Sequence, residues 1–139
     1  MIKKEILLSI YPKYNESIRL GIKNYEFRSF NMEDDSGVIT MWVYETFPTK
    51  SIKYKMLVKN PITKLLFNQN YGLGNDRFIE LISQGKFAYE IVGFEELLFP
   101  ITLEVMKKMN IPAPQGYLYI KNYPKLESIL IKSRTRKFF

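Results

Sequence analysis

The hydrophobic pattern of this chain switches repeatedly between the period of a strand and the period of a helix, which limits the folds open to it. Residues 51–59 alternate, with apolar side chains at every even-numbered position and lysines at 53, 55 and 59. Residues 12–20 have helical spacing instead, because Tyr14 and Ile18 lie four residues apart. Five or six short strands interrupted by three or four helices, without a regular βαβ order, predict an α+β domain centred on a small barrel.

Two segments are predicted to form the middle of this barrel. Residues 5–11 are apolar on both faces, which is typical of a central strand. Residues 38–47 form the longest predicted strand and contain Trp42, the sole tryptophan. Further strands are predicted over 86–97 and 117–120, and helices over 76–82, 102–109 and 124–132.

The composition excludes several classes of site. The 139 residues, 46% of them hydrophobic, fit one domain over residues 1–139. The chain has no cysteine and no histidine, so disulfides, zinc fingers and nucleophile pairs that use histidine are excluded. We expect no metal and no cofactor. The charged start and the short apolar run at 6–10 do not fit a signal peptide, and no apolar run reaches about 18 residues. We therefore expect a cytoplasmic protein without a membrane partner.

The net charge of +7 favours an anionic partner, because a basic surface attracts phosphate. Lys53, Lys55 and Lys59 can keep their strand soluble and discourage edge pairing, or can form a stripe that faces phosphate. The basic tail from about residue 132 is interpreted as a nucleic-acid arm or as a frayed end.

Three loop segments carry weaker signals. Residues 31–37 predict a polar turn, and its acidic pair Asp34-Asp35 favours a solvated loop over a cation site. Residues 62–68 are compatible with a helical turn. The Gly-x-Gly at 72–74 lacks the other residues of a nucleotide-phosphate loop.

Residues 21–28 bring three ionisable side chains together between a predicted helix end and a predicted strand. Gly21 follows the helical pattern and suits a left-handed cap. Glu26 and Arg28 then alternate with aromatic residues, so both charges leave the same face of the strand. Lys23 enters from the turn before it. We expect these charges to lie at one end of a cleft.

The spacing Gly21-x-Lys23-x-x-Glu26-x-Arg28 resembles the motif of the ASCH domains, which belong to the PUA-like superfamily. A Pro48-Thr49-Lys50 corner after an aromatic strand and the segment at 113–119 are similar to that family as well. The resemblance covers most of the chain. It implies a PUA-like pseudo-barrel with a cleft, and a role in binding RNA or modified bases. It also implies two possible activities, since some relatives hydrolyse acetylated cytidine and others are reported as ribonucleases.

The leading hypothesis is a module that binds RNA or a modified nucleotide, with Lys50 among its ligand-binding residues. Glu26 would accept a hydrogen bond from an exocyclic amine, and Arg28 would bind phosphate or a carbonyl. Lys23 would contact a phosphate, while Trp42 or Tyr44 would offer a stacking face. The alternatives are purely structural roles: a Glu26–Arg28 salt bridge that only stabilises the barrel mouth, and core packing of Trp42.

The second hypothesis is a small hydrolase that acts on RNA or on acylated cytidine. Lys23 would be its base, with Glu26 or Glu90 as proton shuttle. The resemblance weakens this mechanism, because Glu26 occupies the position where the amidohydrolase relatives have a threonine. A third possibility is a structural accessory protein that contacts its partner through the lysines at 53, 55 and 59.

Overall fold

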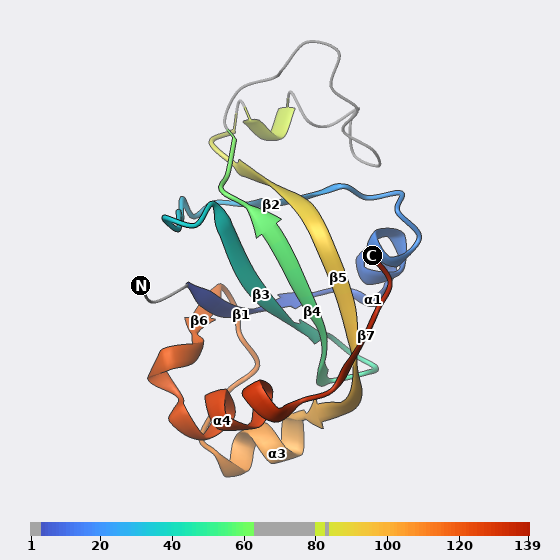
Figure 1. Cartoon of the computed structure of the whole chain (residues 1–139), viewed down its shortest axis with the longest axis vertical. Helices are drawn as coiled ribbons and strands as arrows, with labels where there is room; N and C mark the ends of the chain where they lie inside the picture. Colours follow the sequence, from blue (N-terminus) through green and yellow to red (C-terminus); the bar gives the residue numbers. More distant parts are fainter. Residues whose placement is uncertain (1–3, 63–79, 83) are drawn as a thin grey trace.

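The computed structural model describes residues 4–62, 80–82 and 84–139, and its centre is one curled sheet (Figure 1). The strands are ordered β2-β5-β4-β3-β1-β6, and β7 pairs with β5 beside this path. The strands are β1 (Glu5–Ile10), β2 (Tyr25–Arg28), β3 (Val38–Glu45), β4 (Ser51–Lys59), β5 (Phe87–Thr102), β6 (Tyr117–Tyr119) and β7 (Thr135–Lys137). The helices are α1 (Pro12–Arg19), α3 (Leu103–Lys108), the short 3-10 helix η1 (Ile120–Asn122) and α4 (Pro124–Lys132). The predicted α+β class is confirmed, and the sheet predicted to form a small barrel is a curled half-barrel.

Strand β1 occupies the interior of the sheet, as its two apolar faces predicted. It runs parallel to β3 on one side and antiparallel to β6 on the other. Ile6 and Leu8 point into the core that the curled sheet encloses, and Leu7 points into a second core on the opposite face. Apolar side chains on both faces of a strand are typical where the sheet is covered on both sides.

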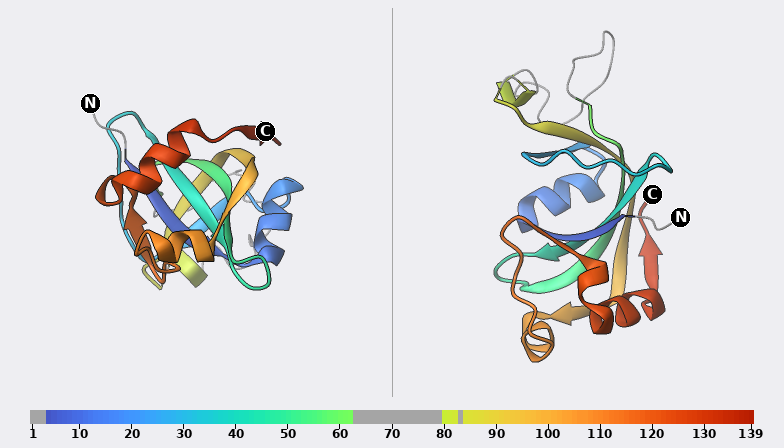
Figure 2. Two further views of the ribbon diagram at one scale, coloured as in Figure 1. Left: turned by 90° about the horizontal axis from the view of Figure 1, so that it is seen from below. Right: turned by 90° about the vertical axis from the view of Figure 1, so that its left-hand side faces the viewer.

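The two cores lie on opposite faces of the sheet. The first is lined by alternating residues of β1, β3, β4 and β5, and it contains the stacked rings of Tyr54 and Phe94. The second packs beneath α3, η1 and α4, which cover one end of the curled sheet (Figure 2). The predicted inward set of residues 51–59 is buried, but the bulge between Ile52 and Tyr54 places Ile52 in the second core.

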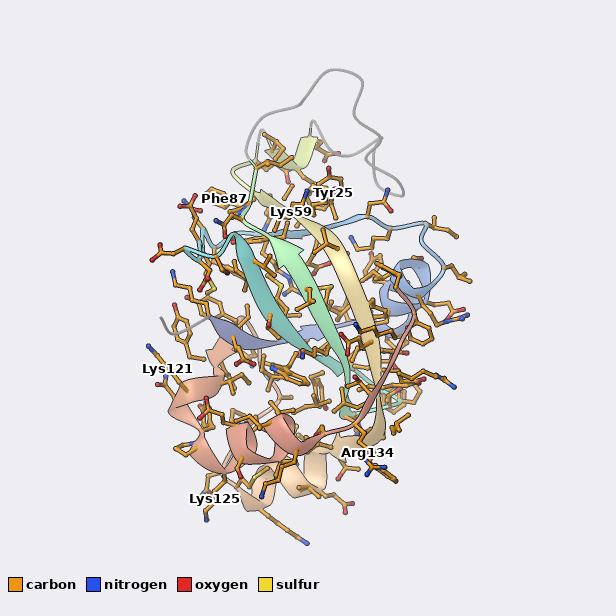
Figure 3. All side chains as sticks on the ribbon, viewed as in Figure 1. Tyr25, Lys59, Phe87, Lys121, Lys125 and Arg134 are labelled. Carbon is orange, nitrogen blue, oxygen red and sulfur yellow. The ribbon has the colours of Figure 1, made fainter. Side chains whose placement is uncertain are left out.

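The C-terminal residues differ from the predicted arm or frayed tail. Helix α4 begins at Pro124, as predicted, and β7 then pairs antiparallel with β5. Backbone bonds between Phe94 and the last two residues fix the chain end against β5, and the Phe138 ring packs against the first core. Apolar packing therefore orders this segment, while basic side chains such as Arg134 remain exposed along it (Figure 3).

The turn at 31–37 is also more ordered than a solvated loop. Asp34 is only 5% exposed and accepts hydrogen bonds from the backbone nitrogens of Lys4 and Ser36. The helical turn predicted over 62–68 and the loop at 71–75 lie almost entirely outside the described residues. Of the helix predicted over 76–82, residues 80–82 are described and are helical. In the described part of the chain, no helix has the length and apolar character that crossing a membrane requires.

Candidate functional site

The end of α1 sets the position of Lys23. Pro12 occupies the first turn of this helix, and Gly21 adopts a φ of 76° directly after its C-cap. The backbone nitrogens of Ile22 and Lys23 both bond to Ser17 O, at 2.9 and 3.1 Å. A residue with a β-carbon is disfavoured at such a φ. The predicted glycine cap is confirmed, and it turns the chain sharply into β2.

Lys23, Glu26 and Arg28 form one ionic cluster. Arg28 Nε and Nη2 lie 2.8 and 2.7 Å from Glu26 Oε2, and Nη2 also donates to Ser9 O at 2.8 Å. Lys23 Nζ donates to Tyr25 O at 2.6 Å and lies 3.6 Å from Glu26 Oε1. The three side chains are between 9 and 20% exposed. The carboxylate is therefore held mainly through one of its two oxygens.

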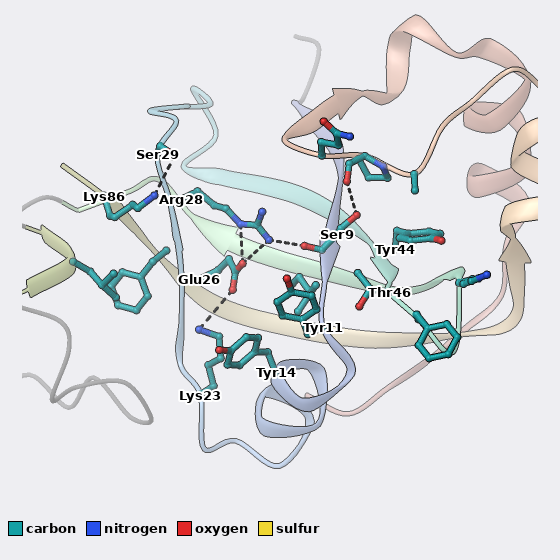
Figure 4. A pocket seen from close by; sticks show the side chains of 18 residues that line it. Ser9, Tyr11, Tyr14, Lys23, Glu26, Arg28, Ser29, Tyr44, Thr46 and Lys86 are labelled. Atoms are coloured by element: carbon teal, nitrogen blue, oxygen red, sulfur yellow. Dashed lines mark hydrogen bonds and ion pairs between the residues drawn. The ribbon is translucent and has the colours of Figure 1, made fainter. Parts of the chain in front are cut away.

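This cluster faces a cavity of about 1110 Å³, which we call the main cavity (Figure 4). Its walls come from the end of β1, the start of α1, β2, the end of β3 and the β3–β4 turn. The described lining residues are Ser9, Ile10, Tyr11, Tyr14, Lys23, Glu26, Phe27, Arg28, Ser29, Tyr44, Thr46, Phe47, Lys50, Leu81, Lys86, Ala113, Pro114 and Gln115.

The main cavity is basic and has aromatic rings at its edge. Among its described lining residues, four carry positive charge and Glu26 alone carries negative charge. Tyr11, Tyr14 and Phe47 are 60, 39 and 75% exposed. Tyr44 also lines the main cavity but is only 4% exposed, and its burial raises the pKa of its hydroxyl above the ordinary value. The arrangement suits a ligand with negative charge and flat apolar rings.

Five of the residues proposed from the sequence line the main cavity, namely Lys23, Glu26, Arg28, Tyr44 and Lys50. Two do not. Trp42 is 4% exposed in the second core, donates from Nε1 to Glu5 at 2.9 Å, and is covered by Lys55. Glu90 pairs with Lys59 at 3.2 Å and is absent from the described lining.

Several lining residues were not predicted from the sequence, including Tyr11, Tyr14, Phe47 and Lys86. Tyr11 and Phe47 each precede a proline at the end of a predicted strand, and that position was a usable signal for a cavity rim. Lys86 carried no such signal. Its Nζ lies 3.4 Å from Ser29 Oγ, a contact between residues 57 positions apart.

A second buried carboxylate holds the cavity walls together. Glu45, 4% exposed, accepts a hydrogen bond from Asn15 Nδ2 of α1 at 3.1 Å and another from Thr49 Oγ1 in the β3–β4 turn. Lys53 Nζ of β4 lies 3.8 Å away. Glu45 thus joins the helix that carries Tyr14 to the turn that carries Phe47.

Comparisons with known proteins agree with the geometry at the level of the fold. No protein-family model and no curated protein matches the sequence. Among solved structures, one mutant form of the ASCH protein from Zymomonas mobilis superposes with a TM-score of 0.69 at 21% identity, over 95% of this chain and 98% of that one. A second mutant form gives 0.68 at 20% identity, over 95% and 100% of the two chains. The ASCH protein itself gives 0.68 at 20% identity, over 94% and 96%. The chain therefore has the fold of this ASCH protein, as the resemblance of the motif at residues 21–28 predicted.

Proposed function

We propose that this protein binds RNA or a modified nucleotide in the main cavity. The observation that carries the proposal is the meeting of Lys23, Glu26 and Arg28 on the wall of an open cavity with exposed aromatic rings at its edge. A sealed salt bridge would have had a structural role only. The ASCH fold supports the proposal, since the family resemblance implies RNA or modified-base binding, and a cytoplasmic location would suit this role.

The cluster assigns different tasks to the two oxygens of Glu26. Oε2 is engaged by Arg28 at 2.7 and 2.8 Å. Oε1 lies 3.6 Å from Lys23 Nζ, which exceeds an ordinary hydrogen bond, so Oε1 can accept from an exocyclic amine of a base. The described contacts of Arg28 use Nε and Nη2, so Nη1 can donate to a phosphate or a carbonyl oxygen.

The aromatic rim supplies the other half of the interaction. Tyr11 and Tyr14 have ring centroids 6.0 Å apart, and both rings are exposed at the edge of the main cavity. Stacking a base on such a ring contributes on the order of 1 to 3 kcal/mol. We assign stacking to Tyr11 and Tyr14. Trp42 and Tyr44 are both 4% exposed and pack in the second core, and of these two only Tyr44 lines the main cavity.

The hydrolase alternative has less support. Glu90 is paired with Lys59 and does not line the described part of the main cavity, so of the two proposed proton shuttles only Glu26 lies near Lys23. Glu26 is itself bound by Arg28. Incubation with N4-acetylcytidine and with labelled RNA tests this alternative, because product that disappears on Lys23→Ala would favour an enzyme.

Fluorescence anisotropy with labelled single-stranded RNA tests the binding proposal directly. We expect Arg28→Ala to weaken binding roughly ten- to hundredfold, as the loss of charge-assisted hydrogen bonds implies. Lys23→Ala should weaken it less and lower the slope of log affinity against log salt by about 0.7. Arg28→Lys keeps the charge and removes the planar fork, so it should recover only part of the loss.

The matched control is Lys125→Ala, which removes the same charge from α4 on another face of the molecule (Figure 3). Its affinity should equal that of the parent protein. Thermal melts of all variants establish that they are folded. Unchanged affinity in both Arg28→Ala and Lys23→Ala would contradict the proposal.

A further inference from the structure

A second, smaller cavity adjoins the main cavity at Lys50. It has a volume of about 430 Å³ and lies between the β3–β4 turn and α3. Lys50 lines both cavities, and its carbonyl accepts a hydrogen bond from Leu103 N at 3.0 Å, which fixes the turn against the start of α3. The two cavities therefore lie next to each other, with Lys50 between them.

Lys50 has an unusual backbone conformation for its residue type. Its φ is 47°, in the left-handed region that residues with a β-carbon enter at a cost on the order of 1 kcal/mol. This conformation sets Lys50 between the cavities, with Nζ 5.7 Å from the centre of the Phe47 ring. The ring is 75% exposed. Lys50 and the exposed ring of Phe47 therefore lie together between the two cavities, and we call this pair the ridge.

The same pairing of lysine with an aromatic ring occurs inside the main cavity. Lys23 Nζ lies 5.7 Å from the Tyr14 ring and 5.5 Å from the Phe27 ring. Proteins hold single-stranded nucleic acid with positive charges that contact the phosphates and with aromatic rings on which the bases stack. The lysine–aromatic pairing occurs at both Lys23 and Lys50, which suits a ligand of more than one nucleotide.

The volumes of the two cavities also suit a ligand larger than one nucleotide. Cavities of about 300 to 1,000 Å³ enclose most of a drug-sized ligand. The main cavity, at about 1110 Å³, exceeds this range before the second cavity is added. The second cavity contributes one further cation, Lys107, and one carboxylate, Glu104. With Lys50 included, its described lining has one more positive than negative side chain.

We propose that a single-stranded polynucleotide runs from the main cavity across the ridge of Phe47 and Lys50 into the second cavity, where Lys107 contacts a backbone phosphate. This inference rests on the proposed function and narrows its ligand from a free nucleotide to a strand. The base held beside Glu26 and the phosphate at Lys107 would belong to different nucleotides.

A length series tests the proposal, with cytidine monophosphate at one end and oligocytidylates up to about six nucleotides at the other. Affinity should rise with length. Lys107→Ala should weaken binding of the longest strand several-fold and lower its salt slope by about 0.7, while leaving the monophosphate unaffected. Lys108→Ala is the matched control, because Lys108 is the next residue of α3, is exposed as Lys107 is, and lines neither cavity.

The failure of this inference can be told apart from the failure of the proposed function. Equal affinity for the monophosphate and the longest strand would overturn the inference alone. Equal effects of Lys107→Ala and Lys108→Ala on strand binding would do the same. Absence of binding to every RNA probe and to nucleotides would overturn the proposed function, and this inference with it.

Discussion

Glu26 and Glu45 are both buried carboxylates on strands beside the main cavity, yet their partners differ. Glu26 is held by two cations, and all three side chains line the cavity. Glu45 is held by the neutral donors Asn15 and Thr49, with Lys53 at 3.8 Å, and it is not among the described lining residues. One carboxylate faces the space where a ligand would bind, and the other faces the structure that shapes this space.

The difference shows how a buried charge can be assigned a role from its partners. Two neutral donors, one from α1 and one from the β3–β4 turn, satisfy Glu45 of β3 and join these elements, which is a structural task. The cluster around Glu26 leaves one oxygen beyond hydrogen-bond range of its nearest cation. Incomplete satisfaction at a cavity wall is typical of a binding group, because a ligand can complete it.

The largest effect on stability is expected from Glu45→Ala. The change removes the acceptor for Asn15 Nδ2 and Thr49 Oγ1, and the Asn15 Oδ1 atom is already buried without a hydrogen-bond partner among the described residues. An unpaired buried donor costs about 1 to 3 kcal/mol, so the loss at Asn15 alone should lower the free energy of unfolding by about 2 kcal/mol. Urea denaturation measures this loss. A change below about 0.5 kcal/mol would show that Glu45 does not join the cavity walls.

Glu26→Ala is expected to lower stability less than Glu45→Ala. Lys23 and Arg28 would then face a water-accessible cavity, so the free energy of unfolding should fall by about 1 kcal/mol. Ligand binding should respond more strongly. We expect Glu26→Gln to reduce the preference for oligocytidylate over oligouridylate, because the acceptor for the exocyclic amine loses its charge. Anisotropy with the two probes gives this ratio. An unchanged ratio would remove Glu26 from base recognition.

Asp34 provides a third carboxylate, which is not among the described lining residues of the main cavity, and its expected effect is a change in the pH dependence of stability. Hydrogen bonds from Ser36 and from the backbone of Lys4 lower the pKa of Asp34 to about 2. Because the folded pKa lies below the unfolded value of about 3.9, the stabilising contribution is present above about pH 4 and is lost as pH falls toward 2. Denaturation across this range should show a smaller pH dependence in Asp34→Asn than in the parent protein. Identical pH dependence would contradict the assignment.

Much of the local structure follows from the sequence. The first residues of α1 and α4 follow from their prolines, and Gly21 marks the turn into β2. The alternation of residues 51–59 predicts the buried side chains of β4, although the bulge places Ile52 in the second core. These features depend on neighbours within a few positions of the chain, and such neighbours are visible as spacing.

The tertiary structure alone decided which residues share the cavity. Trp42 and Tyr44 lie two residues apart, were both predicted to offer a stacking face, and point to the same core. Only Tyr44, near the end of β3, lines the main cavity. Glu90 is turned to Lys59, and β7 folds the basic end of the chain onto β5. Such placements depend on pairings across many residues, for which local periodicity carries no information.

The sequence by itself thus determined the positions of most helices and strands, the resemblance to ASCH domains, and the charged motif at 21–28. Only the tertiary structure placed that motif on the wall of a cavity with Tyr11 and Phe47 at its edge, and only it brought a second cavity beside Lys50. The physical reason is that spacing sets the face on which a side chain leaves its strand or helix. The packing of distant elements sets what that face meets.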